Sequence, residues 1–427
     1  MSSRIVNFPE QELLEKANRF LPGGSNGNTI YQGLIIKEGK GSRVWDVSGN
    51  EYIDHSLGSG PMILGHAHPE VVEAVTERVA QGTTFFGLNE PTILLAEEIV
   101  KAVPCADRVR FTSTGTEATF HAMRVARAHR RRDKVLKFEG GYHGMNDYAL
   151  MSMAPTDPGE FPSAIPDSIG IPAAIGNEVF IAPFNDIETT TNIIEQHHDE
   201  LGGVIVEPLQ RVIPPVPGFL KGLREVTREY GIPLIFDEVV TGFRFAYGGA
   251  QEYYGVVPDI CAMGKAVSGG YPLSVIAGRE EIMSHFGGDQ DHPYGRVLQE
   301  GTLNGNAVAA VAGLATLKVL KREGTYVNLF RIGGMIKEGF ERILMDAEIP
   351  AQVIGEPPMF DILFTNQVIR DYRDSLRCGA GKNARLVELL RERGIYKNDA
   401  KFYVSTAHDE RDVEEVLVAF ESVVEAL

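Results

Sequence analysis

The sequence is poor in the features that mark several specialised classes of protein. It has only three cysteines in 427 residues, Cys105, Cys261 and Cys378, and their wide spacing matches neither a disulfide framework nor a zinc site. No stretch approaches the ~20 apolar residues that a membrane span needs. Residues 1–15 lack a long apolar run and carry three glutamates, unlike a signal peptide. We therefore expect a soluble, cytoplasmic protein in a reducing compartment.

Positive charge is also scarce. Lys and Arg number 41 against 58 Asp and Glu, which gives a net charge of −17. This balance argues against a partner such as nucleic acid or an anionic membrane, because both require a net attraction to phosphate. It still allows a small anionic ligand that local dipoles hold. The length suggests two to three domains, or one large α/β domain with an appendage.

The hydrophobic pattern predicts an α/β fold. From about residue 69, short runs that are apolar at nearly every position alternate with helical patterns. These runs are residues 109–111, 135–138, 204–206, 234–236 and 275–277. Such strands, spaced by helices, indicate a mostly parallel sheet that is covered on both faces. Residues 350–427 have the pattern of a smaller α+β unit, and residues 154–180 that of a long loop.

Ligands of an open α/β sheet bind at strand ends, and the first strand end of interest is residues 111–118, Phe-Thr-Ser-Thr-Gly-Thr-Glu-Ala. A strand enters a turn with several hydroxyls and Gly115, and a helix follows. The glycine permits close approach of the backbone, and the free N–H groups of a helix start suit a phosphate. The alternative is an ordinary hydroxyl N-cap without a ligand.

The second strand end is residues 138–144, Phe-Glu-Gly-Gly-Tyr-His-Gly. Its glycines predict a turn that presents Tyr142 in a cleft, where the aromatic ring can stack on a planar ligand. A tyrosine packed in a turn is the alternative.

Two acids, Asp237 and Glu238, come at the end of the apolar run 234–236. Burial of both is costly unless each has a partner. Consecutive strand side chains point to opposite faces, so the two are not a cooperating carboxylate pair. Asp237 and Val239 share a face, and that face can hold a cation and an apolar ring together.

A lysine among glycines and small apolar residues is the fourth candidate. Lys265 lies 28 residues after Asp237, about one helix and one strand further along. In an enclosed site its pKa would fall and a neutral amine would be available for Schiff-base chemistry. A solvated surface lysine is the alternative.

Together these segments contain a phosphate cradle, a stacking aromatic, a carboxylate for a ring cation and a lysine for an aldehyde. This is the set of groups that a pyridoxal phosphate enzyme needs, because the protonated ring then acts as an electron sink. No metal is expected, since His66 and His68 have no third and fourth ligand nearby.

At these residues the sequence resembles the class III (fold type I) pyridoxal-phosphate aminotransferases, and within them it is most similar to the glutamate-1-semialdehyde 2,1-aminomutase branch. The resemblance extends from about Pro22 to the C-terminus. Its strongest stretches are residues 60–69, 114–118, 140–144, 236–244, 248–253 and 301–306. It implies a large coenzyme-binding domain over residues 61–310. It also implies a small α+β domain that consists of residues 311–427 and the N-terminal segment, residues 1–60.

The resemblance also implies roles for single residues. Lys265 would form the aldimine with pyridoxal 5′-phosphate and then carry the proton between substrate and coenzyme. Asp237 would face the pyridinium nitrogen, with Tyr142 on one ring face and Val239 on the other. Residues 114–116 would hold the phosphate.

The remaining implied coenzyme contacts are His143, Glu207 and Thr302, the last from the neighbouring subunit of a homodimer. Thr114, Gly115 and Thr116 are the individual members of the phosphate turn. The loop 154–180 would correspond to a mobile gate over the site.

Three departures from the aminomutase pattern concern the substrate. Residues 25–31 lack the arginine that grips the substrate carboxylate, and an isoleucine or tyrosine cannot make a bidentate contact. The loop after Glu207 and Pro208 lacks the family's asparagine. Arg211 in this loop is a candidate anion contact in place of the missing arginine, and a plain surface arginine is the alternative. Residues 396–401 lack a proline–serine turn.

We therefore predict an intermolecular aminotransferase that passes an amino group from an amino acid or amine to an oxo-acid, aldehyde or ketone through pyridoxamine phosphate. The alternative is the aminomutase, an intramolecular transfer that gives 5-aminolevulinate. A non-catalytic coenzyme-binding relative, and a decarboxylase or racemase on the same fold, are further alternatives.

Overall fold

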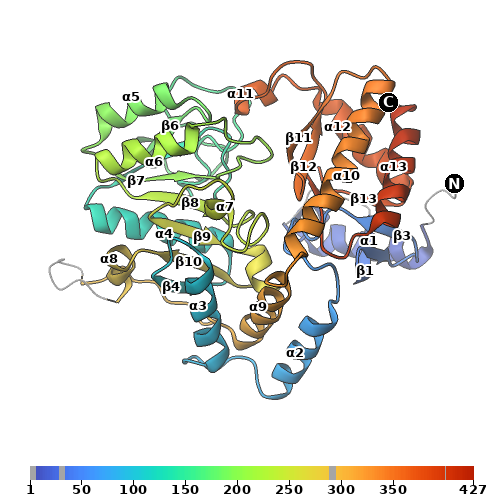
Figure 1. Ribbon diagram of the computed structural model, residues 1–427, viewed down its shortest axis with the longest axis horizontal. Helices are drawn as coiled ribbons and strands as arrows, with labels where there is room; N and C mark the ends of the chain where they lie inside the picture. Colours follow the sequence, from blue (N-terminus) through green and yellow to red (C-terminus); the bar gives the residue numbers. More distant parts are fainter. Residues whose placement is uncertain (1–5, 28–33, 288–294, 400) are drawn as a thin grey trace. The chain divides into compact units, whose positions relative to one another are not determined.

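The computed structural model describes residues 6–27, 34–287, 295–399 and 401–427 (Figure 1). The chain divides into two compact units. The central unit contains Glu70–Tyr326 and Gln367–Arg377, and the terminal unit contains Met1–Pro69, Val327–Asn366 and Cys378–Leu427. The first two boundaries between the units thus follow residues 69 and 326. The boundaries predicted from the sequence follow residues 60 and 310.

The central unit is built on a seven-stranded sheet with the order β4-β10-β9-β8-β7-β5-β6. The strands are β4 (Arg108–Thr112), β5 (Lys134–Phe138), β6 (Val179–Ala182), β7 (Leu201–Val206), β8 (Leu234–Glu238), β9 (Ile260–Met263) and β10 (Ser274–Gly278). Strand β10 is antiparallel to its neighbours β4 and β9, and the other pairs are parallel. The predicted mostly parallel sheet is therefore confirmed.

Helices accompany this sheet along the chain. They are α2 (Pro69–Ala80), α3 (Glu90–Ala102), α4 (Gly115–Arg130), α5 (Ile187–His197), α6 (Phe219–Glu229), α7 (Ala250–Tyr253), α8 (Glu280–Met283), α9 (Ala307–Leu320) and α11 (Tyr372–Ser375). Short 3₁₀ turns are η2 (Ala173–Glu178), η3 (Lys265–Ser268) and η4 (Ser284–Phe286).

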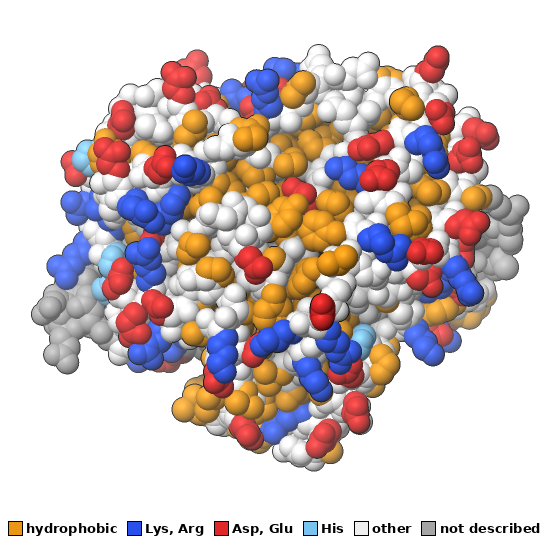
Figure 2. All heavy atoms as spheres, viewed as in Figure 1, with side chains coloured by type: hydrophobic (Ala, Val, Ile, Leu, Met, Phe, Trp, Pro, Cys, Tyr) orange, Lys and Arg blue, Asp and Glu red, His pale blue; other side chains and the backbone are white. Residues whose placement is uncertain are grey.

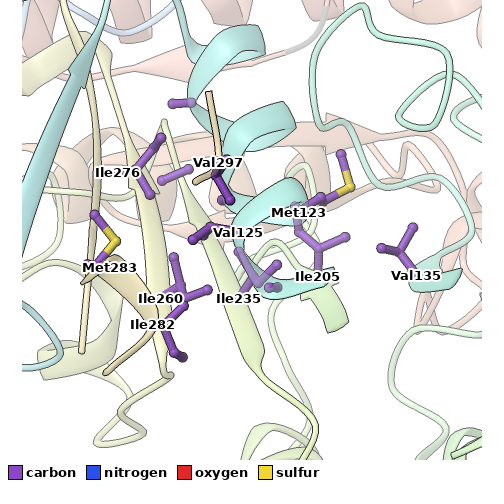
Figure 3. Close-up of a cluster of buried hydrophobic side chains, with 14 of the residues drawn as sticks. Met123, Val125, Val135, Ile205, Ile235, Ile260, Ile276, Ile282, Met283 and Val297 are labelled. Atoms are coloured by element: carbon purple, nitrogen blue, oxygen red, sulfur yellow. The ribbon is translucent and has the colours of Figure 1, made fainter. Parts of the chain in front are cut away.

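Helix α4 packs against β7, β9 and β10 through a buried apolar cluster (Figure 3). Its inner face carries Ala118, Ala122 and Met123, while Ile205 and Ile235 come from the sheet. Burial of each large aliphatic side chain stabilises the fold by roughly 1.5–3 kcal/mol. Because this face fixes α4 on the sheet, it also fixes the N-terminus of α4 at the end of β4.

Within its described residues, the terminal unit contains two small sheets and four longer helices drawn from both ends of the chain. The strands β1 (Ile36–Lys40), β2 (Arg43–Asp46), β3 (Glu51–Asp54) and β13 (Ile395–Tyr396) form one sheet, and β11 (Gln352–Glu356), β12 (Met359–Leu363) and β14 (Phe402–Tyr403) form the other. The helices are α1 (Phe8–Phe20), followed by η1 (Pro22–Gly24), α10 (Thr325–Asp346), α12 (Ala380–Glu392) and α13 (Glu410–Val424). Parallel pairing of β13 with β3 unites the two ends, as expected for a small α+β domain built from both termini.

Charged side chains of both signs are interspersed on the face shown in Figure 2. Among the helices that the structure describes, none combines the length and the apolar character that a membrane crossing requires.

Candidate active site

The carboxyl ends of the parallel strands bring the predicted residues to one edge of the central sheet. Gly115 follows β4, Glu207 follows β7, and Asp237 lies at the end of β8. Lys265 follows β9. Parallel neighbours end at the same edge of a sheet, so these positions converge although the sequence separates them widely.

The turn between β4 and α4 begins the helix with a capping box. The Thr114 hydroxyl accepts a hydrogen bond from the Glu117 backbone N–H at 3.2 Å, and the Glu117 carboxylate accepts one from the Thr114 N–H at 3.0 Å. The predicted N-cap alternative therefore describes the Thr114 side chain. Within the described chain, the N–H groups of Gly115 and Thr116 donate to no acceptor. These two donors at a helix start suit an anion.

Two glycines let the neighbouring turns close around Val239. A Cβ on Gly115 would lie 2.8 Å from Val239 Cγ1, and a Cβ on Gly264 would lie 3.3 Å from the same atom. Val239 therefore stands between the phosphate turn and the residue that precedes Lys265. This packing ties the ends of β4, β8 and β9 together.

The Asp237 side chain is almost completely buried, and each of its two carboxylate oxygens has a hydrogen-bond partner. Its Oδ2 lies 2.8 Å from Nδ1 of His143, and its Oδ1 accepts a hydrogen bond of 3.0 Å from the Val239 backbone N–H. Glu238 has different partners, among them the Gln251 side-chain amide at 2.9 Å, as the alternation of a strand predicts. Burial raises the pKa of Glu238 to about 7.

His143 orients the Asp237 carboxylate. Its ring is buried, and the carboxylate acceptor at Nδ1 requires that this nitrogen carries a proton. In the described chain Nε2 has no hydrogen-bond partner. The Thr119 hydroxyl donates to the His143 carbonyl at 2.6 Å, which fixes the histidine to α4. Sequence reasoning named His143 as a coenzyme contact but missed its pairing with Asp237.

Glu207 fixes the turn that carries Tyr142. The Tyr142 backbone N–H donates to Glu207 Oε2 at 2.9 Å, and the Tyr142 side chain remains 38% exposed. The Arg211 guanidinium carbon lies 5.1 Å from the centre of the Tyr142 ring. Burial raises the pKa of Tyr142, and the charge of Arg211 opposes that rise.

Arg211 is committed to the protein backbone. Its Nε donates to the Gly140 carbonyl at 2.9 Å and its Nη2 to the Met153 carbonyl at 3.4 Å. Its Nε and Nη2 thus link two backbone segments of the protein, near Gly140 and near Met153.

Lys265 occupies an unusual backbone conformation. Its φ of +51° is in the left-handed region, which costs a non-glycine residue on the order of 1–3 kcal/mol. The side chain is half-buried at the start of η3. Strain of this kind persists where the surroundings determine the conformation, and it often marks functional sites.

A second lysine, Lys137 on β5, was not singled out from the sequence. It is fully buried, and burial lowers its pKa to about 7. Its Nζ donates to the carbonyls of Ala149 at 2.9 Å and Met151 at 2.6 Å. The Lys137 ammonium is therefore committed to holding the loop 145–152.

Thr302 lines a different part of the central unit. It borders a cavity of about 580 Å³ together with the exposed apolar side chains Phe86 and Leu88. None of the other predicted coenzyme residues lines this cavity. The lining of this cavity thus includes Thr302 but not the strand-end group of its own chain. Of the departures, positions 28–31 and 400 lie outside the described residues.

Comparison with known proteins defines the class. The family model described as Aminotransferase class-III matches residues 25–419. The chain therefore belongs to the class III aminotransferase family, whose enzymes depend on pyridoxal phosphate.

Individual relatives are similar over nearly the whole chain. A glutamate-1-semialdehyde 2,1-aminomutase of Methanothermobacter thermautotrophicus is 41% identical and covers 98% of this chain and 99% of its own. An omega-transaminase of Sphaerobacter thermophilus matches with a TM-score of 0.92 and 38% identity, covering 97% of both chains. A transaminase with PLP bound matches with a TM-score of 0.91 and 29% identity over 99% of this chain and 98% of its own.

The residues present fit this coenzyme. The α4 start offers two backbone donors to a phosphate, and Asp237 supplies an oriented carboxylate. Tyr142 and Val239 provide an aromatic and an apolar surface. The donor set therefore matches both the charge and the ring chemistry of pyridoxal phosphate.

Proposed function

We propose that the strand-end group of the central unit holds pyridoxal phosphate and transfers an amino group between small molecules. The observation that carries this proposal is the buried Asp237–His143 pair beside Val239, which packs against both the phosphate turn and the turn of Lys265. The coenzyme, when bound, supplies an aldehyde that bonds amines and a ring that accepts electrons.

Each residue of the proposed site then has a defined role. The N–H groups of Gly115 and Thr116 would hold the phosphate, and the Asp237 carboxylate would keep a proton on the ring nitrogen. Tyr142 and Val239 enclose the ring and exclude water from its faces. Lys265 would hold the coenzyme through its ε-amino group, and its Nζ would carry the substrate proton.

The site is completed in a homodimer. Thr302 of the partner subunit would hold the same phosphate, and the supporting observation is that Thr302 borders a cavity lined by exposed apolar residues. Phe86 and Leu88 are 82% and 91% exposed, and burial against a second copy would remove this apolar surface from water.

We propose a cytoplasmic location for the protein, as expected from the sequence.

For the reaction itself, the comparisons favour the aminomutase over the intermolecular transfer that the sequence analysis predicts. The supporting observation is the 41% identity to a glutamate-1-semialdehyde 2,1-aminomutase over almost the entire chain. We therefore propose conversion of glutamate-1-semialdehyde to 5-aminolevulinate as the first candidate reaction.

Intermolecular transamination is the second candidate, and two observations favour it. Residues 25–31 contain no arginine to grip the substrate carboxylate. The omega-transaminase is nearly as similar in sequence, at 38% identity, and shares the fold.

One experiment separates the two reactions. Coenzyme-loaded protein, in its pyridoxal and pyridoxamine forms, is given glutamate-1-semialdehyde alone, and 5-aminolevulinate is measured. In parallel, amines and α-, β- and ω-amino acids are added with and without a separate oxo acid. Product from the semialdehyde alone establishes the aminomutase. Turnover only with a donor and an acceptor establishes the transaminase, and no turnover in any arm contradicts the proposal.

A further inference from the structure

A segment from the last fifth of the chain belongs to the central unit. Residues 367–377 include α11 and are part of that unit, whereas the residues on both sides, up to Asn366 and from Cys378, are part of the terminal unit. The chain thus contributes one short segment, which contains the helix α11, to the central unit and then returns to the terminal unit. We call residues 367–377 the clamp segment.

Arg373 in the clamp segment binds the residue that follows β5. Its Nε donates to Glu139 Oε2 at 2.7 Å and its Nη2 to Glu139 Oε1 at 3.0 Å. The Glu139 carboxylate is almost completely buried, and the hydrogen bonds to it raise the pKa of Arg373. Two parallel charge-assisted bonds fix both distance and orientation.

The same segment also holds the long loop that begins near residue 154. Arg373 Nη2 donates to the Gly159 carbonyl at 2.6 Å, and the guanidinium carbon lies 4.2 Å from the centre of the Phe161 ring. The Tyr372 hydroxyl donates to the Pro155 carbonyl at 3.0 Å. Residues 155–161 are therefore attached to the clamp segment at several points.

The clamp segment packs directly on the turn that presents Tyr142. A Cβ on Gly140 would lie 2.5 Å from the Tyr372 Cβ, so the two backbones are in close contact. Glu139, bound by Arg373, is three residues before Tyr142. On its other side the turn is fixed by Glu207.

We propose that Arg373 is a positioning residue that holds the turn 139–142 and the loop 155–161 together, and thereby sets the position of the Tyr142 ring against the coenzyme. The inference rests on the proposed placement of the coenzyme at Tyr142. A simple structural tie would instead contribute to the stability of the fold without affecting coenzyme release.

The test compares Arg373→Met with Arg377→Met. Arg377 is an arginine of the same segment whose ion pair with Asp374 is exposed, so it controls for loss of a surface charge. Protease Glu-C reports on the loop, because cleavage after Glu160 requires it to detach, and the fragment is identified by mass spectrometry. The rate of coenzyme release is followed by visible absorbance. Thermal unfolding confirms that each variant is folded, and Arg373→Lys, which keeps the charge, serves if Arg373→Met does not fold.

We expect Arg373→Met to accelerate both Glu160 cleavage and coenzyme release at least about tenfold, the effect of losing about 1.5 kcal/mol of hydrogen bonding to a charged group. Glu139→Gln should act in the same direction, and Arg377→Met should change neither rate more than about twofold.

Equal effects of Arg373→Met and Arg377→Met would overturn the proposal. So would faster cleavage with unchanged release, since Tyr142 would then not depend on the clamp segment. If the parent protein bound no coenzyme, the proposed function would fail, and with it the positioning of Tyr142, while the cleavage assay would still report whether Arg373 holds the loop.

Discussion

The pairing of His143 with Asp237 gives the sharpest quantitative prediction. In His143→Phe a ring of similar size keeps the packing but removes the donor to Asp237 Oδ2. The carboxylate would keep the bond from the Val239 N–H and lose the 2.8 Å bond from the imidazole. Asp237 is only 5% exposed, so water cannot easily replace the lost donor.

The expected magnitude follows from the charge of the acceptor. A hydrogen bond to a buried charged group contributes about 1.5–3 kcal/mol, which corresponds to about 10- to 150-fold in an equilibrium or rate. We therefore expect the loss in coenzyme affinity multiplied by the loss in kcat to be about 10- to 150-fold. His143→Gln, which keeps an N–H donor, should recover part of the loss.

The assay is a double-mutant cycle with Asp237→Asn. Coenzyme affinity is measured by absorbance titration of coenzyme-free protein, and kcat is measured for the single and double variants. Asp237→Asn alone should cripple turnover, because an uncharged ring nitrogen is a poorer electron sink. In the Asp237→Asn background, which has no carboxylate to orient, loss of His143 should cost less than about 0.5 kcal/mol more. An equal loss in both backgrounds would refute the reasoning, since His143 would then act independently of Asp237.

Three further predictions concern neighbouring residues. Lys265→Ala should abolish turnover but retain coenzyme through the phosphate turn; near-normal turnover would remove Lys265 from its role. Gly115→Ala places a Cβ 2.8 Å from Val239 Cγ1, so overpacking of about 1–3 kcal/mol should weaken coenzyme binding, and Val239→Ala should restore part of it in an absorbance titration. Without such rescue, the predicted contact is wrong. Glu238 has a pKa raised to about 7, so the folded state binds its proton more tightly than the unfolded state, and this contribution to stability is lost as pH rises from about 4.5 to about 7. The free energy of unfolding of the parent minus that of Glu238→Gln, from urea titrations, should therefore fall by on the order of 3 kcal/mol across this range; a constant difference would contradict the buried acid.

The sequence alone places Gly115, Asp237 and Lys265 at strand ends, because these residues follow apolar runs of a mostly parallel sheet. Alternation along β8 separates the roles of Asp237 and Glu238, and the glycines mark the turns that approach Val239. These features depend on local pattern and on one rule about where strands end.

The pairings between distant segments could not be predicted in this way. His143 and Asp237 are 94 residues apart, and Arg373 and Glu139 are 234 residues apart. No periodicity connects such pairs, because tertiary packing alone brings them together. Lys137 reads as an ordinary residue of an apolar strand, and only its burial shows that its charge is unusual.

The most direct test of the central claim is to identify the lysine that bonds the coenzyme. Reduction of the loaded protein with borohydride converts a carbon–nitrogen double bond between coenzyme and lysine into a stable amine, and peptide mass spectrometry locates it. We predict that the coenzyme is attached at Lys265 and that Lys265→Ala abolishes this attachment. Attachment at Lys137, the buried lysine with a pKa of about 7, or at any other lysine would contradict the account.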